Sequence, residues 1–300
     1  MLPFRKIVFP VDYSEPCQAV APYVLDMTAR YSAELTAVHA YAPLDAIAHS
    51  AQAFGAVVRG SESQLLITDP ELQSKSHGME EDRLRQFVCE VFPGQTVECF
   101  AQLGEPGSVI DKMAQEQRAD LVMLATRGHG PVRRFLLGSV TAKVLHDLSA
   151  AVWTGAGAAL PDHPVRIPYQ SIVCALDESN EAEAVLRAAA SIASAYRAQL
   201  WILHVVPTPP AYPDVNLEEH TKQLDEASQF KLRELKAKLG VDAPHTVIDS
   251  LLADGIHHEV VRRKADLLIT GRGHATGTFS RLWSHLYSII RDSPCPVLSI

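Results

Sequence analysis

The chain has 300 residues, of which 47% are hydrophobic and 21% charged, and its formal net charge is -8. This length suggests two domains of ordinary size, and the acidic balance disfavours a nonspecific hold on nucleic acid or on an anionic membrane. The first residues run straight into a strand-like segment, and no apolar run approaches the length of a membrane span. The five cysteines form no C-x-x-C pair, which is typical of a reducing compartment. We therefore expect a cytoplasmic chain without nucleic-acid or membrane partners.

The first predicted elements reveal an internal repeat. Residues 6–14 read KIVFPVDYS and residues 171–179 read SIVCALDES, so that Asp12 and Asp177 are 165 positions apart (12 to 177). Leu35–His39 and Leu200–His204 are related by the same displacement (39 to 204). Self-similarity over such distances indicates a duplicated domain.

Further along the chain the displacement shortens. Gly128 and Gly273, each within an Arg-Gly-His triplet, are 145 positions apart (128 to 273). The first copy therefore carries roughly 20 additional residues, a length that follows from the two displacements. The polar segment 43–78 is the candidate insertion, either as a long loop or as a partly helical one.

Short continuous apolar runs alternate with segments whose apolar residues recur every three or four positions. Such runs are typical of strands buried on both faces, and the periodic segments are typical of helices. The alternation predicts an α/β fold with two doubly wound, open, parallel five-stranded sheets related as a pseudo-twofold tandem repeat. The predicted strands span 6–11, 34–41, 96–103, 120–125 and 150–154, then 170–176, 199–206, 245–252, 266–270 and 295–300.

The boundary between the copies falls in a stretch of glycines and prolines with no periodic apolar face, which favours a linker. We predict a first domain at 1–156, a linker at 157–168 and a second domain at 169–300.

Ligands of open parallel sheets bind at the carboxyl ends of the strands, where the strand order reverses. In the first copy that rule selects Asp12, after the first strand, and the loop that begins at Ala125, after the fourth. The loop ends in Gly138-Ser139 at the start of a predicted helix. Glycines allow a close approach of backbone to ligand, and a helix start offers N–H groups to an anion. Arg127, Arg133 and Arg134 add positive charge.

This loop resembles the phosphate loop of the universal stress protein family, G-x-x-G, nine residues, then G-[ST]. Gly128 and Gly138-Ser139 fit that spacing, while Ala125 replaces the first glycine. The opening segment 9–14 and the strand that ends in His39-Ala40 resemble the family as well. The resemblance covers both halves nearly end to end and implies an adenine nucleotide alpha hydrolase-like fold.

The resemblance also implies a ligand, ATP with or without Mg²⁺, and a set of contacts. Asp12 and the backbone of Val11 would meet the adenine and ribose, and Ala40 would offer main-chain contacts to the base. The ribose and phosphates would be lined by Ala125, Arg127, Gly128, Gly138, Ser139 and Val140.

The second copy departs from the family pattern. Thr270 stands at the first glycine, and nine residues after Gly273 the sequence has Trp283-Ser284 in place of Gly-Ser. A tryptophan blocks the close backbone approach that a phosphate needs. We therefore expect little or no nucleotide binding in the second copy.

Structural alternatives stay open for these residues. The glycines are compatible with plain turns, and Asp12 and Asp177 with the start of a helix. His39 and His204 read as satisfied core histidines. We find no catalytic motif and no metal ligand set, so we expect no enzyme beyond slow ATP hydrolysis.

Three functions are consistent with the sequence. The first is an ATP-binding regulator of a stress response that acts on an unidentified protein partner. The second is a nucleotide-free adaptor, and the third is an enzyme of a related adenine-binding fold, such as an ATP pyrophosphatase. By the resemblance, the two domains pair within one chain through 152–154 and 296–300, and a homodimer remains compatible with this arrangement.

Overall fold

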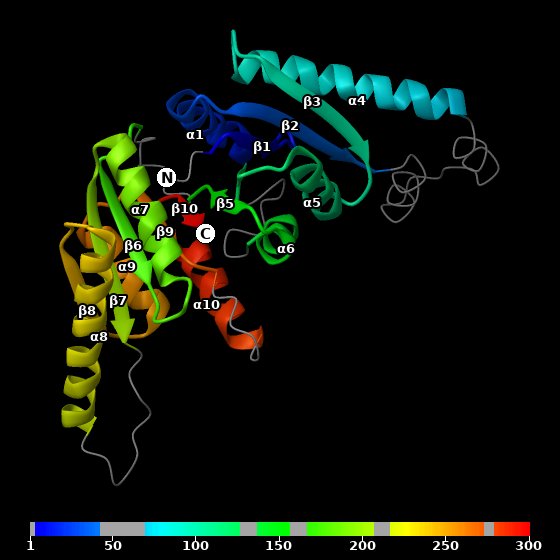
Figure 1. Cartoon of the computed structure of the whole chain (residues 1–300). Coiled ribbons are helices and arrows are strands. Elements are labelled where there is room, and N and C mark those ends of the chain that lie inside the picture. The colour runs from blue at the N-terminus through cyan, green and yellow to red at the C-terminus, as the bar shows by residue number, and fades with distance from the viewer. Residues whose placement is uncertain (1–3, 43–69, 127–136, 157–166, 207–216, 273–278) are drawn as a thin grey trace. The chain divides into compact units, whose positions relative to one another are not determined.

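The computed structural model describes residues 4–42, 70–126, 137–156, 167–206, 217–272 and 279–300 (Figure 1). The chain divides into two compact units. The unit that we call the N-terminal body holds residues 4–124 and 139–150. The C-terminal body holds the described residues within 125–138 and 151–300.

The N-terminal body is a parallel sheet with helices on both faces. Its strands lie in the order β3-β2-β1-β4, and the pairs of β1 with β2, β1 with β4 and β2 with β3 are parallel. Helices α1 and α4 contact each other, as do α5 and α6. Because crossovers between parallel strands are right-handed as a rule, the strand order puts the first pair on one face and the second pair on the other. The elements are β1 (Lys6–Pro10), α1 (Glu15–Tyr31), β2 (Glu34–Tyr41), α4 (Pro70–Val91), β3 (Val97–Leu103), α5 (Pro106–Gln117), β4 (Leu121–Leu124) and α6 (Ser139–Asp147).

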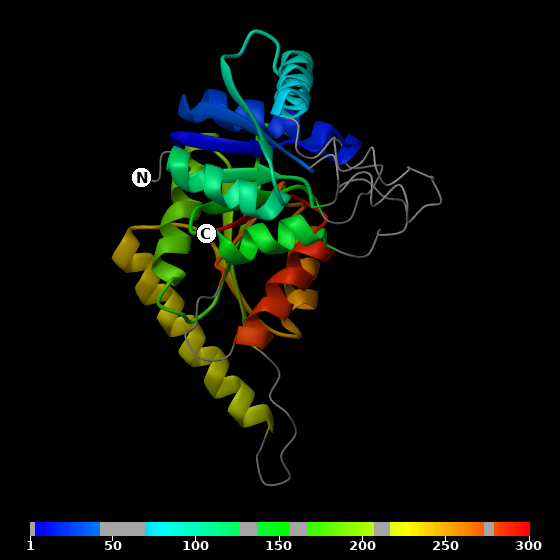
Figure 2. The ribbon, with the colours of Figure 1, turned by 90° about the vertical axis from the view of Figure 1, so that its right-hand side faces the viewer.

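The C-terminal body repeats this architecture. Its strands lie in the order β5-β10-β9-β6-β7-β8, and α8 and α10 cover opposite sides of them (Figure 2). The pairs within β6 to β10 are parallel, whereas β5 runs antiparallel to β10, with Trp153 opposite Leu298. The elements are β5 (Ala151–Thr154), β6 (Ser171–Leu176), α7 (Ala182–Tyr196), β7 (Gln199–Val206), α8 (Leu217–Leu239), β8 (His245–Asp249), α9 (Leu252–Arg262), β9 (Leu267–Thr270), α10 (Phe279–Asp292) and β10 (Val297–Ser299).

The duplicated α/β fold predicted from the sequence is confirmed. Each predicted strand is found within a few residues of its expected bounds, and the central strands β1 and β6 are buried on both faces. The predicted partners 152–154 and 296–300 form the β5–β10 ladder. In the insertion, residues 70–78 belong to helix α4, and residues 43–69 lie outside the described residues. The helical alternative is therefore correct for the end of that segment.

One carboxylate in each copy ties the fourth strand to the first. Asp120 Oδ2 accepts hydrogen bonds from the backbone N–H groups of Arg5 (2.8 Å) and Lys6 (3.0 Å). Asp266 Oδ2 accepts from Gln170 (2.8 Å) and Ser171 (2.9 Å) in the same manner. The Ala-Asp motif that marks the repeat is thus a structural device that fixes the entry of the first strand.

Within the described residues, no helix is both long enough and apolar enough to cross a membrane.

Candidate functional site

The turn after β1 is built by Asp12 and Ser14. Asp12 Oδ1 accepts hydrogen bonds from the Ser14 backbone N–H (3.0 Å) and hydroxyl (2.6 Å). Ser14 in turn caps α1, because its Oγ accepts from the Cys17 N–H at 3.2 Å. Of the structural alternatives for Asp12, the turn is therefore observed, because Ser14 is the N-cap of α1 and Asp12 orients that cap. Asp12 stays exposed to solvent.

Val11 and Ala40 lie at the carboxyl ends of β1 and β2, beside this turn. The Val11 N–H donates to the Val38 carbonyl at 2.8 Å, and the Val11 carbonyl is 2.7 Å from His39 Nδ1. Ala40, the next residue of β2, is half-buried and stands opposite Gln102 of β3. The structure thus brings Val11, Asp12 and Ala40 together at one edge of the sheet of the N-terminal body.

The predicted phosphate loop is described only at its two ends. Ala125 follows β4, and Arg127 and Gly128 lie outside the described residues. At the far end, the Gly138 N–H donates to the Thr126 carbonyl at 2.9 Å, and the Leu137 N–H donates to the Tyr287 hydroxyl at 2.9 Å. The two ends of the loop therefore meet within the C-terminal body.

The Gly138 contact limits the part that the backbone N–H of this residue can play in the phosphate site expected from the sequence. Because the Gly138 N–H is engaged by Thr126, it is not among the donors that an incoming anion would meet first. Ser139 and Val140 open α6 in the N-terminal body, Ser139 exposed and Val140 half-buried. The first N–H groups of a helix have no partner within the helix, so these two residues are the better donors.

The same framework recurs in the second copy. Asp177 Oδ1 accepts from the Ser179 N–H (3.1 Å) and hydroxyl (2.6 Å), as Asp12 does from Ser14. His204 Nδ1 lies 2.8 Å from the Leu176 carbonyl, as His39 Nδ1 does from that of Val11. Both histidines are satisfied by backbone, as expected.

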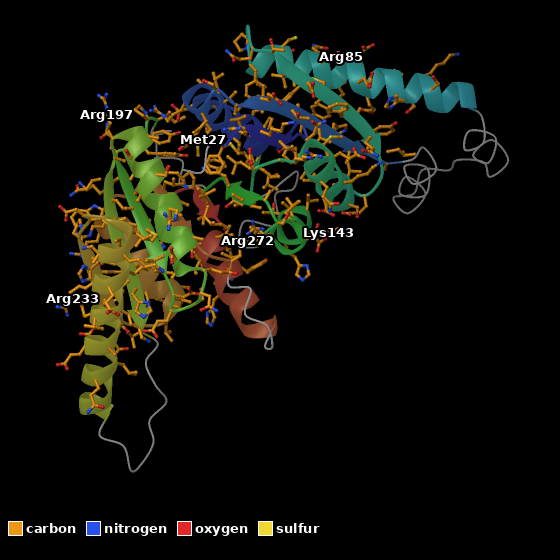
Figure 3. All side chains as sticks on the ribbon, viewed as in Figure 1. Met27, Arg85, Lys143, Arg197, Arg233 and Arg272 are labelled. Atoms are coloured by element: carbon orange, nitrogen blue, oxygen red, sulfur yellow. The ribbon has the colours of Figure 1, made fainter. Side chains whose placement is uncertain are left out.

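The space beside this second framework is narrow and lined mainly by apolar side chains. A cavity of only about 80 Å³ lies where β6, β7 and β9 end, on the side of α9 and α10. Arg272, which is labelled in Figure 3, lines this cavity and is 8% exposed. Burial lowers the pKa of its guanidinium to about 10 despite the nearby Glu181 carboxylate. The other lining residues are Ala175, Leu176, Asp177, Leu203, Val205, Leu252, Ile256, Thr270, Gly271, His285, Leu286 and Ile289.

The sequence singled out Thr270 and Trp283 in the second copy, and the structure describes the side chain of the first only. Thr270 ends β9 and is buried, with its carbonyl accepting from the Ile300 N–H at 3.0 Å. Trp283 belongs to α10, but its side chain lies outside the described residues. The role predicted for its indole stays a prediction.

The burial of Arg272 was not anticipated from the sequence. The pattern gave no signal for a buried Arg272, since the Arg-Gly-His triplet reads as a solvated loop. Among the described residues, no group of three or more His, Cys, Asp or Glu side chains is placed to hold a metal ion.

The comparisons with known proteins agree with this geometry. The model of the universal stress protein family matches residues 3–154 and 168–300. The chain belongs to this family. A curated universal stress protein of Thermus aquaticus, from the 3' region of a QAH/OAS sulfhydrylase, is 27% identical over 135 residues, which are 44% of this chain and 98% of that protein.

Two solved structures share the tandem fold. A universal stress protein from Archaeoglobus fulgidus is 19% identical with a TM-score of 0.65, covering 100% of this chain and 97% of its own. A functionally unknown protein from Pseudomonas aeruginosa PAO1 is 13% identical with a TM-score of 0.68, covering 100% and 93%. At these identities the likeness shows the fold, and the ligand must be argued from the residues of this chain.

Proposed function

We propose that this universal stress protein binds ATP in its first copy and regulates a stress response through the bound nucleotide. The observation that supports this most is the convergence of Val11, Asp12 and Ala40 at the ends of β1 and β2. In the second copy the matching place holds a cavity of only about 80 Å³, with the Arg272 guanidinium buried in its wall. One nucleotide per chain is the expected stoichiometry.

Each proposed residue has a role that its chemistry supports. The exposed Asp12 carboxylate accepts hydrogen bonds from ribose hydroxyls, and the backbone of Val11 and Ala40 recognises the edge of the adenine. Ser139 and Val140 donate their helix-start N–H groups to phosphate oxygens, where the positive end of the α6 dipole adds to the attraction. The other residues proposed for the phosphates are Ala125, Arg127, Gly128 and Gly138.

The proposed residues supply binding without a catalytic group. Asp12 is the one carboxylate among the nine, and its Oδ1 already accepts two hydrogen bonds from Ser14. This arrangement favours recognition over activation of a water molecule, so we propose hydrolysis that is slow at most. Mg²⁺ commonly reaches such sites on the phosphates of the nucleotide, and no role of the protein residues proposed here depends on it.

The domain boundaries, compartment and partners complete the proposal. We propose a first domain at 1–156, a linker at 157–168 and a second domain at 169–300, and we propose that the two domains pair within the chain. We also propose a cytoplasmic location and a protein partner that responds to the bound nucleotide. A homodimer is compatible with this arrangement.

Isothermal titration of the full chain with ATP tests this function. We expect saturable heat with one site per chain, and competition by ADP at the same site. A nucleotide-free adaptor predicts no heat at any concentration and no nucleotide released from the purified protein. That result would remove the proposal and leave only the duplicated fold.

A further inference from the structure

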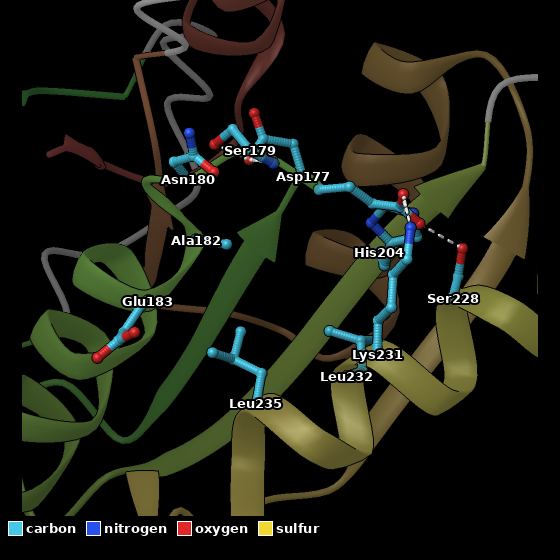
Figure 4. Close-up of a pocket in the computed structure, with 11 residues that line it drawn as sticks. Asp177, Ser179, Asn180, Ala182, Glu183, His204, Ser228, Lys231, Leu232 and Leu235 are labelled. Carbon is cyan, nitrogen blue, oxygen red and sulfur yellow. Dashed lines mark hydrogen bonds and ion pairs between the residues drawn. The ribbon is translucent and has the colours of Figure 1, made fainter. Parts of the chain in front are cut away.

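A cavity of about 330 Å³ lies in the C-terminal body between α7 and α8, and it shares only Asp177 with the narrow cavity described above. In Figure 4, Leu232 and Leu235 of α8 lie across from Ala182 at the start of α7, with His204 and Lys231 toward one end. This volume is within the range of small-molecule sites. The remaining lining residues are Asp177, Glu178, Ser179, Asn180, Glu183 and Ser228.

The duplication identifies what fills the same place in the first copy. Helices α4 and α8 end at Val91 and Leu239, 148 positions apart (91 to 239). Tyr13, in the turn after β1, corresponds to Glu178, in the turn after β6, at the displacement of 165 positions (13 to 178). The helix displacement aligns the pairs Glu80 and Ser228, Arg83 and Lys231, Leu84 and Leu232, and Phe87 and Leu235.

In the first copy an aromatic ring occupies this place. The Tyr13 ring lies 4.5 Å from the His39 ring and 5.4 Å from the Phe87 ring, and the Arg83 guanidinium lies 4.1 Å from the Tyr13 centroid. Burial raises the pKa of Tyr13 to about 12, with the Glu80 carboxylate adding to the rise. A histidine, a cation and an apolar side chain thus surround a phenol ring.

In the second copy the surrounding groups remain and the ring is gone. His204, Lys231 and Leu235, the counterparts of the three groups around Tyr13, all line the cavity. Glu178 replaces Tyr13 and is held by an ion pair with Lys231 and a 2.9 Å hydrogen bond from the Ser228 hydroxyl. Its carboxylate lies 3.8 Å from His204 Nε2, as that of Glu80 lies 3.7 Å from His39 Nε2.

The carboxylate beside the histidine therefore comes from helix α4 in the first copy (Glu80) and from the turn after β6 in the second copy (Glu178). Glutamate and leucine are smaller than tyrosine and phenylalanine, so the exchange leaves room for a ring.

We propose that this cavity binds a small neutral aromatic molecule of one or two rings, which takes the place that the Tyr13 ring takes in the first copy. The ring stacks on His204 and packs on Leu232 and Leu235, while the Lys231 ammonium lies against its face. A hydroxyl or ring nitrogen on the ligand finds polar partners at Ser179 and Asn180 on the rim. This site is independent of the nucleotide proposed for the first copy.

Phenol is the probe for the first test, because it is the side chain of Tyr13 without its backbone. Nuclear magnetic resonance on the isotope-labelled full chain should show intermolecular Overhauser contacts from phenol to the His204 ring and the Leu235 methyl groups. Cyclohexanol, of similar size and with the same hydroxyl, should bind about tenfold more weakly, because it lacks a π-face. Absence of contacts to both residues, or equal affinity for the two probes, would overturn the proposal.

A paired substitution tests the same site from the protein side. Glu178→Tyr with Leu235→Phe rebuilds the first copy's arrangement in the second and should weaken phenol binding by at least about tenfold, because the ring position is filled. ATP titration of that variant should be unchanged, which separates this site from the nucleotide site. The matched control, Tyr13→Phe, should leave phenol binding as in the parent chain.

Undiminished phenol binding in a folded double variant contradicts the proposal. If its thermal melt shows that it does not fold, the contacts in the parent chain decide the question.

Discussion

The two copies of this chain agree where contacts build the fold and differ where a ligand would lie. The hydrogen bonds of Asp12 with Ser14 recur between Asp177 and Ser179 to within 0.1 Å in each case. By contrast, Tyr13 and Glu178 differ in size and charge, and Ala125 follows β4 where Gly271 follows β9. Residues whose contacts build the fold are needed in both copies. Residues that would face a ligand are free to differ if only one copy binds that ligand.

The largest expected effect comes from giving the first copy the tryptophan of the second. Gly138→Trp should weaken ATP binding at least about 100-fold, equivalent to about 2.7 kcal/mol, because an indole beside the α6 start blocks the approach of phosphate. Isothermal titration measures the affinity, and the far-ultraviolet circular dichroism spectrum should match that of the parent.

The control is the reverse change in the second copy. Trp283→Gly should leave the stoichiometry at one, because Arg272 and the apolar wall still narrow the cavity there. Unchanged ATP affinity in Gly138→Trp would count against the phosphate role of the loop.

The fold could be predicted almost completely from the sequence because its signals are local. Continuous apolar runs predict buried strands wherever they occur. Asp12 and Ser14 predict that a helix begins within the next three residues. The Tyr13 to Glu178 exchange was also visible in the sequence once the copies were aligned. Its consequence was not, because the cavity depends on which side chains of α8 face that turn.

The two aspartates that anchor the first strand of each copy differ in their exposure to solvent. Asp266 is 6% exposed and Asp120 is exposed, although both accept two backbone hydrogen bonds. Asp266→Ala should lower the free energy of unfolding by about 2 kcal/mol, because two part-buried N–H groups lose a charged acceptor, whereas Asp120→Ala should cost about 1 kcal/mol, because water replaces it. Urea unfolding followed by circular dichroism measures both. Equal losses would show that burial does not govern these contacts.

Helices α5 and α9, which occupy corresponding places in the two copies, begin differently. Glu105 caps α5, accepting from the N–H groups of Gly107 (2.9 Å) and Ser108 (2.8 Å). Its counterpart Leu251 is the N-cap residue of α9, makes no side-chain cap hydrogen bond and is 70% exposed. Leu251→Asp should therefore raise the free energy of unfolding by about 1 kcal/mol, and Glu105→Leu should lower it by a similar amount.

The Glu105 hydrogen bonds with Gly107 and Ser108 lower the pKa of its carboxyl. The stability that Glu105 adds is therefore present above its ordinary pKa of about 4.5 and lost as the pH falls through the lower folded value. Denaturant melts of both variants at neutral and acidic pH provide the measurement, and a Leu251→Asp variant no more stable than its parent would contradict the capping argument.

The smallest expected effect concerns β8, where His245 stands at the place that Cys99 takes in β3 (99 to 245). His245 Nε2 donates to the Gln229 side-chain oxygen at 2.9 Å, and its Nδ1 faces the Lys236 ammonium at 3.4 Å. Burial lowers the pKa of His245 below its ordinary 6.5, and the charges of Lys236 and Arg233 lower it further. At a pH between the lowered folded pKa and 6.5, the folded chain therefore keeps this imidazole neutral while the unfolded chain protonates it.

The sign of the pH effect follows from that difference. As the pH falls below about 6.5, the unfolded state binds more protons, so the stability contributed by neutral His245 is present above that pH and lost below it. His245→Gln should flatten the fall in unfolding free energy between about pH 7 and pH 5. His258→Gln, at an exposed position on α9, should leave the slope unchanged. An equal slope in the His245 variant and its parent would show that Lys236 moves away from the charged ring, so that the contact in β8 does not penalise protonation.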